Sequence, residues 1–155
     1  MKQSAIDFSA LILRVALGLI FIPHGFAKVF GADGPGAFAS DMPQYGIPAF
    51  LGYIAALAEF FGAALLIAGL LTRFNAFLLA CVMIAAIVVV HGPEARMVEG
   101  HGPMRLMAMV KEIEFPLSLL AIAVALVLLG GRRFSLDQLF KLEDRVLHMV
   151  KRRNP

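Results

Sequence analysis

The sequence predicts an all-α integral membrane protein, a four-helix bundle followed by an amphipathic cytoplasmic helix. Of its 155 residues, 60% are hydrophobic and only 16% are charged, and the mean hydropathy is +0.83. Soluble domains average about 45–50% apolar and about 25% charged residues. Because a water-soluble protein this small could not bury so much apolar surface in one core, the composition excludes most soluble enzymes, disordered chains and disulfide scaffolds.

Four apolar segments are each close to the roughly 20 residues that a helix needs to cross a bilayer. They lie at about residues 8–30, 49–71, 75–91 and 113–130. The connection Thr72–Asn75 is short enough to predict a tight turn, which makes the second and third segments an antiparallel hairpin. The other two connections, residues 31–48 and 91–111, are rich in Gly and Pro and are predicted to be loops.

The two ends of the chain have different expected roles. The first apolar segment contains Arg14 and is followed by no small-residue cleavage site, which predicts a retained helix rather than a signal peptide. Residues 1–133 are therefore predicted to form the membrane bundle. Residues 134–155 alternate apolar and basic side chains at helical spacing, which is typical of an amphipathic helix on an anionic lipid surface or of a docking surface for a partner protein.

The distribution of charge predicts the orientation. The chain has 14 Lys and Arg residues against 11 Asp and Glu residues, a net charge of +3. The basic residues gather on the side of the membrane that holds both termini, which indicates cytoplasmic termini. Their position also favours the lipid bilayer over nucleic acid as the acidic partner.

Six ionisable residues lie in or near the spans, where insertion costs roughly 2.5–3.5 kcal/mol for a charged side chain at the centre of a helix. They are Arg14, His24, Lys28, Glu59, His91 and Glu114. Small residues share helical stripes with Arg14, Glu59 and Glu114, and such stripes are typical packing faces, so these groups are predicted to point into the bundle. The helical rise places His24, His91 and Glu114 at one depth and brings Arg14 within reach of Glu59. One interpretation is a structural Arg14–Glu59 ion pair, and the other is a polar intramembrane pocket.

The six residues are the candidate binding residues of such a pocket. It would suit a quinone headgroup or another small polar-headed lipophile, with His and Glu available for proton exchange. Haem between His24 and His91 is less favoured, and so is copper bound by His91, His101, Met97, Met104, Met107 and Met109. The single cysteine, Cys81, forms no CxxC pair, and no metal site is predicted. No HExxH, P-loop or dinucleotide motif identifies a catalytic residue.

Several ordered motifs resemble the DoxX family. Residues 13–18 (LRVALG) and 24–28 (HGFAK) resemble its first helix, while Glu59, Gly62 and residues 66–73 (LIAGLLTR) resemble its second helix and turn. Residues 130–137 (GGRRFSLD) are similar to its closing motif, with Phe134 where Tyr is usual. The matching family positions are Arg14, His24, Lys28, Glu59 and Arg73.

The resemblance implies a small four-helix protein of the bacterial inner membrane. Some members are implicated as subunits of quinone-linked oxidoreductases, including thiosulfate:quinone oxidoreductase, or of assemblies that handle oxidative stress, and distant relatives have no redox chemistry. We therefore expect a membrane subunit of a redox complex that binds quinone and associates with partner subunits or with itself. A non-catalytic scaffold that recruits a soluble partner is the alternative, and a pathway for protons or small solutes is a third.

Overall fold

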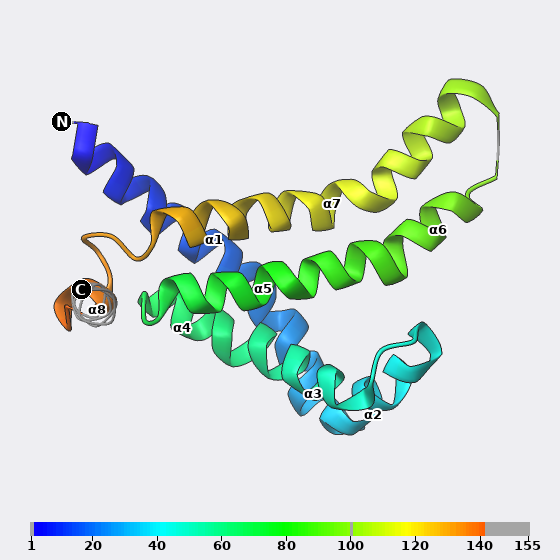
Figure 1. The fold of residues 1–155 in the computed structure, drawn as a ribbon, viewed down its shortest axis with the longest axis horizontal. Coiled ribbons are helices and arrows are strands. Elements are labelled where there is room, and N and C mark those ends of the chain that lie inside the picture. The colour runs from blue at the N-terminus through cyan, green and yellow to red at the C-terminus, as the bar shows by residue number, and fades with distance from the viewer. Residues whose placement is uncertain (1, 100, 142–155) are drawn as a thin grey trace, which may run out of the picture.

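A computed structural model describes residues 2–99 and 101–141, and every regular element in these ranges is a helix (Figure 1). Four helical segments are long and apolar enough to cross a membrane, which confirms the predicted fold class. The first is α1 (Lys2–Phe30) and the fourth is α7 (Gly102–Leu129). The second combines α3 (Ala49–Leu57), the π turn η2 (Ala58–Gly62) and α4 (Ala63–Ala68), and the third combines α5 (Thr72–Ala86), the π turn η3 (Ile87–His91) and α6 (Gly92–Met97).

The two connections predicted to be loops contain helices. Residues 31–48 form α2 (Gly34–Asp41) and the 3₁₀ turn η1 (Met42–Tyr45). In residues 91–111, α6 extends the third span to Met97 and α7 begins at Gly102. The prolines misled the prediction. Pro35 and Pro103 occupy the first turns of α2 and α7, where proline removes no helical hydrogen bond, and Pro93 lies inside the third span directly after the π turn η3.

The tight turn predicted at Thr72–Asn75 lies three residues earlier. Gly69 ends α4 with a φ of 71°, and α5 already begins at Thr72. The second and third spans still form the expected antiparallel hairpin (Figure 1).

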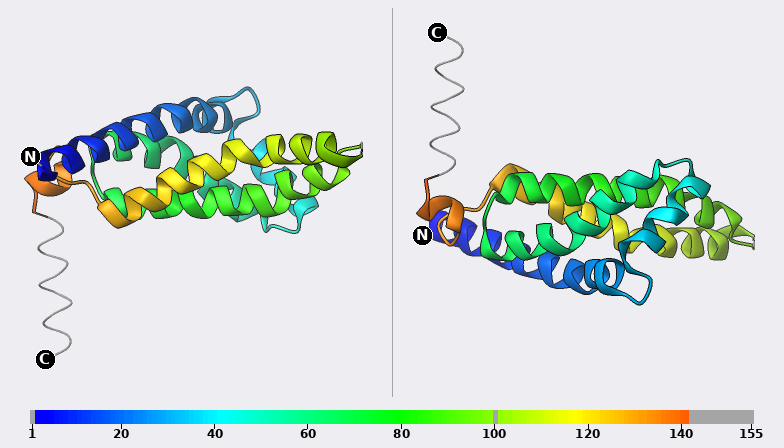
Figure 2. Two further views of the ribbon diagram at one scale, coloured as in Figure 1. Left: turned by 90° about the horizontal axis from the view of Figure 1, so that it is seen from above. Right: turned by 90° about the horizontal axis from the view of Figure 1, so that it is seen from below.

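The bundle has two ends that differ in packing (Figures 1 and 2). At the terminal end, α1 begins, α4 turns into α5 and α7 finishes; at the opposite end, the α2 end, α2 and η1 lie beside α3. α5 packs along α7, and α1 packs against α4 and η2, whereas α3 barely contacts α5. The hairpin therefore opens toward the α2 end. A core of Leu17, Leu66, Leu79 and Leu126 closes the rest.

The predicted packing faces are confirmed for α1 and wrong for α7. Arg14, Gly18, Phe21 and Gly25 are all buried, as the stripe on α1 predicts. On α7 the buried residues are Pro116, Leu119, Ala123 and Leu126, whereas Glu114 and Ser118 are exposed. Glu114 therefore does not point into the bundle, because a different face of α7, which carries Leu119, Ala123 and Leu126, is buried.

The segment after α7 folds back over the terminal end. The Asp137 carboxylate accepts hydrogen bonds from the backbone N–H groups of Leu71 (2.6 Å) and Thr72 (2.8 Å), at the start of α5. Arg14 is fully buried and donates through Nη2 to the carbonyl oxygen of Phe134. The short helix α8 (Leu136–Leu139) follows, while most of the predicted amphipathic tail, residues 142–155, lies outside the described residues.

Candidate functional site: an intramembrane cavity

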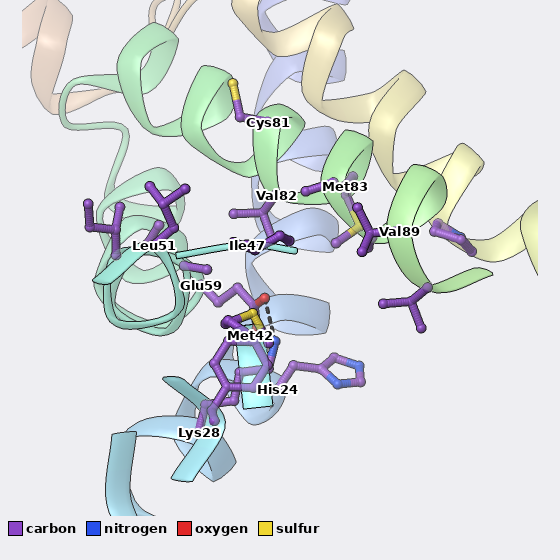
Figure 3. A pocket seen from close by; sticks show the side chains of 18 of the residues that line it. His24, Lys28, Met42, Ile47, Leu51, Glu59, Cys81, Val82, Met83 and Val89 are labelled. Carbon is purple, nitrogen blue, oxygen red and sulfur yellow. Dashed lines mark hydrogen bonds and ion pairs between the residues drawn. The ribbon is translucent and has the colours of Figure 1, made fainter. Parts of the chain in front are cut away.

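A cavity of about 720 Å³ lies where the hairpin opens toward the α2 end. It is bounded by α1, α3, η2, α5, η3 and α7, and it is covered by residues of α2 and η1. Most of its lining is apolar, and Figure 3 shows this lining around one charged pair. The polar groups that line it are His24, Lys28, Asp41, Tyr45, Glu59 and His91, together with Cys81.

The charged pair joins α1 to η2 (Figure 3). Lys28 Nζ lies 2.6 Å from Glu59 Oε1 and 2.7 Å from Glu59 Oε2, so one ammonium group bonds both carboxylate oxygens. The Glu59 side chain is 2% exposed and the Lys28 side chain 27%. Lys28 Nζ also lies 4.2 Å from the centre of the Phe38 ring on α2, a distance typical of a cation–π contact. These contacts satisfy both charges inside a largely apolar cavity.

Close helix packing brings the pair together. A side chain at Gly25 would overlap the backbone of Glu59 and Phe60, so only glycine lets α1 approach η2 this closely. Lys28 lies three residues farther along α1, almost one turn from Gly25 and on the same stripe. The spacing HGFAK thus places its lysine against Glu59 for a steric reason.

All four spans depart from regular α-helical sequence or geometry beside the cavity. Pro23 lies inside α1 directly before His24, and Pro116 lies inside α7 and lines the cavity. In the other two spans, the π turn η2 carries Glu59 and the π turn η3 ends at His91. Single π turns in α-helices are frequent at functional sites because they displace side chains from the helical register. This coincidence marks the cavity as the candidate site.

The structure brings four of the six sequence-predicted site residues to the cavity. His24, Lys28, Glu59 and His91 line it, drawn from three spans. Arg14 and Glu114 are not among the lining residues, since Arg14 lies at the terminal end and Glu114 is exposed on α7.

The predicted Arg14–Glu59 ion pair is wrong. Lys28 takes the place that the prediction gave to Arg14. Arg14 instead bonds Phe134, and its Nε and Nη1 atoms are buried without a hydrogen-bond partner in the described part of the chain.

Sequence reasoning missed Phe38, Asp41 and Tyr45, which α2 and η1 bring over the cavity. They lie in residues 31–48, which the sequence predicts to be a loop. The Gly and Pro content of this segment does not indicate that it packs over the cavity.

A cluster of metal-ligating groups borders the cavity at His91. One ligand atom from each of His91, Glu94 and Glu112 lies within 4.8 Å of the other two. His91 Nδ1 is buried without a hydrogen-bond partner among the described residues and lies 3.6 Å from Glu94 Oε2. Both glutamates are exposed, so water can solvate their carboxylates without an ion.

A family model and a related protein both match most of the membrane-spanning part of the chain. The family model described as DoxX matches residues 9–92, more than half of the chain. A Bacillus subtilis (strain 168) protein named "Putative oxidoreductase CatD" is 32% identical over 135 residues, which cover 87% of this chain and 89% of that protein. No solved structure matches the chain. The four membrane-spanning helices, the motifs around Arg14, Lys28 and Glu59, and these matches show that the chain is a multi-pass membrane protein and that it belongs to the DoxX family.

Proposed function

We propose that this protein is the membrane subunit of a quinone-linked oxidoreductase and that its cavity binds the quinone headgroup. The observation that carries the proposal is the buried Lys28–Glu59 pair inside a largely apolar cavity of about 720 Å³. Small-molecule sites have this composition, and volumes of roughly 300–1,000 Å³ are typical of them. The oxidoreductase name of the Bacillus subtilis relative supports a redox role.

The residues present fit a quinone. Its ring is flat and apolar and suits a lining that includes Phe21, Met83 and Leu119. Its carbonyl oxygens accept hydrogen bonds, which Lys28 Nζ can donate, and the Glu59 carboxylate can hold a proton beside it. Bound quinone would supply the two-electron acceptor chemistry. We propose that electrons come from a partner subunit that carries its own redox cofactor.

The charges favour an orientation with both termini in the cytoplasm of a bacterial inner membrane. The basic residues toward the terminal end include Lys2, Arg73, Arg132, Arg133 and Lys141. Those toward the other end are Lys28, Arg96, Arg105 and Lys111. An excess of Lys and Arg is typical of cytoplasmic segments. In this orientation the cavity lies in the outer half of the membrane.

Quantifying bound quinone tests the proposal. The protein is purified in mild detergent, supplied with a tail-less dimethoxy-methyl-benzoquinone, and its binding is measured by equilibrium dialysis. We expect saturable binding near one quinone per chain, and we expect Glu59→Gln to weaken it at least tenfold because Lys28 loses its ionic partner inside the cavity. The matched control is Glu114→Gln, the same chemical change at an exposed position outside the cavity, which should alter binding less than twofold.

Two results would contradict the proposal. One is wild-type protein that binds no quinone at saturating concentration. The other is equal loss of binding in the two glutamine variants, which would place the site elsewhere. A wild-type protein that lacks quinone binding but co-purifies with a soluble partner would favour the scaffold role instead.

A further inference from the structure

The cavity has one polar side and one apolar side. Its charged and titratable groups come from α1, α2, η1, η2 and η3. α3 and α5 contribute only apolar side chains and one thiol to the lining. These residues are Leu51, Ile54 and Ala55 on α3, and Leu78, Cys81, Val82, Met83, Ala85 and Ala86 on α5. A ligand that matches both sides has a polar headgroup and an apolar extension directed between α3 and α5.

The apolar side is open to the surroundings of the protein. α3 and α5 barely contact each other, because the hairpin opens toward the α2 end. Leu51 is 41% exposed and Ile54 is 49% exposed, although both line the cavity. Cys81, across the gap on α5, also lines the cavity and is exposed. Since these residues lie within membrane-spanning segments, the surroundings that they face are lipid.

We propose that the gap between α3 and α5 is a lateral portal through which a lipid-borne ligand enters from the bilayer. The headgroup lies at the Lys28–Glu59 pair, and the hydrocarbon tail passes between Ile54 and Cys81 into the lipid. This inference rests on the proposed function, because it takes quinone as the ligand. It specifies that the natural ligand is a quinone that keeps its long tail in the membrane throughout binding.

The open portal leaves room for the tail of the bound ligand and adds little to its affinity. Lipid tails are as apolar as the portal, so the hydrocarbon tail gains little by moving from one to the other. A long-tailed quinone and its tail-less counterpart should therefore bind the wild-type protein with affinities within about fivefold, when concentration is expressed per volume of membrane. Closing the gap should exclude only the ligand whose tail must pass through it.

A tryptophan at the portal provides the test, in lipid nanodiscs that contain the full chain. We expect Ile54→Trp to weaken binding of a decyl-tailed benzoquinone at least tenfold and binding of the tail-less quinone less than twofold. Retained binding of the tail-less quinone shows that the variant is folded. The matched control is Phe115→Trp, since Phe115 is also exposed (52%) and lines the cavity, but from α7. It should affect both quinones equally.

Cys81 supplies a second measurement that needs no variant, because it is the only cysteine in the sequence. Its labelling by a membrane-permeant maleimide should slow at least fivefold when the decyl-tailed quinone is bound. The tail-less quinone should leave the labelling rate within twofold, since its ring lies at Lys28 and Glu59 and no tail covers the thiol.

The outcomes separate the inference from the proposed function. If wild-type protein binds neither quinone, the proposed function fails and the portal for quinone fails with it. If both quinones bind but Ile54→Trp affects them equally, or affects neither, the portal is wrong while quinone binding stands. Equal protection of Cys81 by both quinones, or protection by membrane lipid alone, also overturns the portal.

Discussion

The Lys28–Glu59 pair places two opposite charges in a largely apolar cavity, where each compensates the other. Glu59 is almost fully buried, and Lys28 is its only salt-bridge partner among the described residues. Breaking a buried pair by removing one partner typically costs about 3–5 kcal/mol, because an uncompensated charge remains. We expect Lys28→Met to lower the free energy of unfolding by about 3 kcal/mol, as measured by chemical unfolding in detergent micelles.

A double variant separates the loss of the pair from the loss of one charge. Lys28→Met combined with Glu59→Gln leaves no uncompensated charge, so it should be more stable than Lys28→Met alone, by at least about 1 kcal/mol. If the two substitutions instead destabilise the protein additively, the pair is not the source of the effect. Lys111→Met, at an exposed position on α7, should be nearly neutral and serves as the control.

The sequence does not show which cation pairs with Glu59. Periodicity places Arg14 and Lys28 on the same stripe of α1, and the sequence correctly predicts that this stripe is buried from Arg14 to Gly25. It could not predict which of the two reaches Glu59. That choice depends on the segment after α7, which returns across 120 positions of sequence to offer Arg14 the Phe134 carbonyl oxygen. No helical spacing encodes such a long-range contact.

At the scale of elements, the turn between α4 and α5 requires glycine for two reasons. Gly69 has a φ of 71°, and a methyl group there would overlap Arg14 Nη1 and crowd Ser135. We expect Gly69→Ala to lower the free energy of unfolding by about 1 kcal/mol from backbone strain, plus a further loss from displacement of the buried Arg14.

Gly46→Ala gives the matched control. Gly46 has a φ of 73° and no atom within 4 Å of the added methyl group, so only the backbone strain applies. Thermal unfolding of both variants should show the larger loss for Gly69→Ala. Equal losses would show that Arg14 adjusts freely and that its contact with this turn adds nothing.

The π turns mark the limit of sequence prediction for elements. The sequence shows Pro23 and Pro116 plainly, although neither ends its helix. Nothing in residues 58–62 (AEFFG) or 87–91 (IVVVH) identifies a π turn, because the two segments share no sequence pattern, and Gly62 and the Gly92-Pro93 pair are equally compatible with an ordinary helix end. η2 packs against α1 at Gly25, and η3 contacts α7. The π geometry of these segments, and with it the directions of the Glu59 and His91 side chains, therefore depends on tertiary packing.

At the scale of the whole molecule, the number and type of the spans follow from the sequence. In a bilayer the backbone must satisfy its hydrogen bonds within each segment, so apolar stretches of this length can only be helices or barrel strands. The cavity does not follow from hydropathy. It forms because the core at the terminal end packs tightly, while α3 and α5 separate toward the α2 end, and lipid-facing and cavity-facing apolar residues look alike in sequence.

The closing motif should be needed for the stability of the whole bundle rather than only for recruitment of a partner. Residues 134–137 supply the carbonyl oxygen that Arg14 bonds and the carboxylate that caps α5 at Leu71 and Thr72. Hydrogen bonds to charged groups contribute about 1.5–3 kcal/mol each. We therefore expect truncation after Arg133 to lower the free energy of unfolding by about 3 kcal/mol or more.

A second truncation isolates this motif from the basic tail. Ending the chain after Lys141 keeps every contact described at the terminal end, so it should lower the free energy of unfolding by less than truncation after Arg133 does. Asp137→Asn in the full chain should lower the free energy of unfolding by an amount between those of the two truncations. The single amide oxygen of Asn can replace only one of the two carboxylate oxygens that accept hydrogen bonds from Leu71 and Thr72. If truncation after Arg133 leaves the unfolding transition unchanged, Asp137 does not hold the α4–α5 turn. The motif would then be free to act in binding a partner, as the scaffold alternative requires.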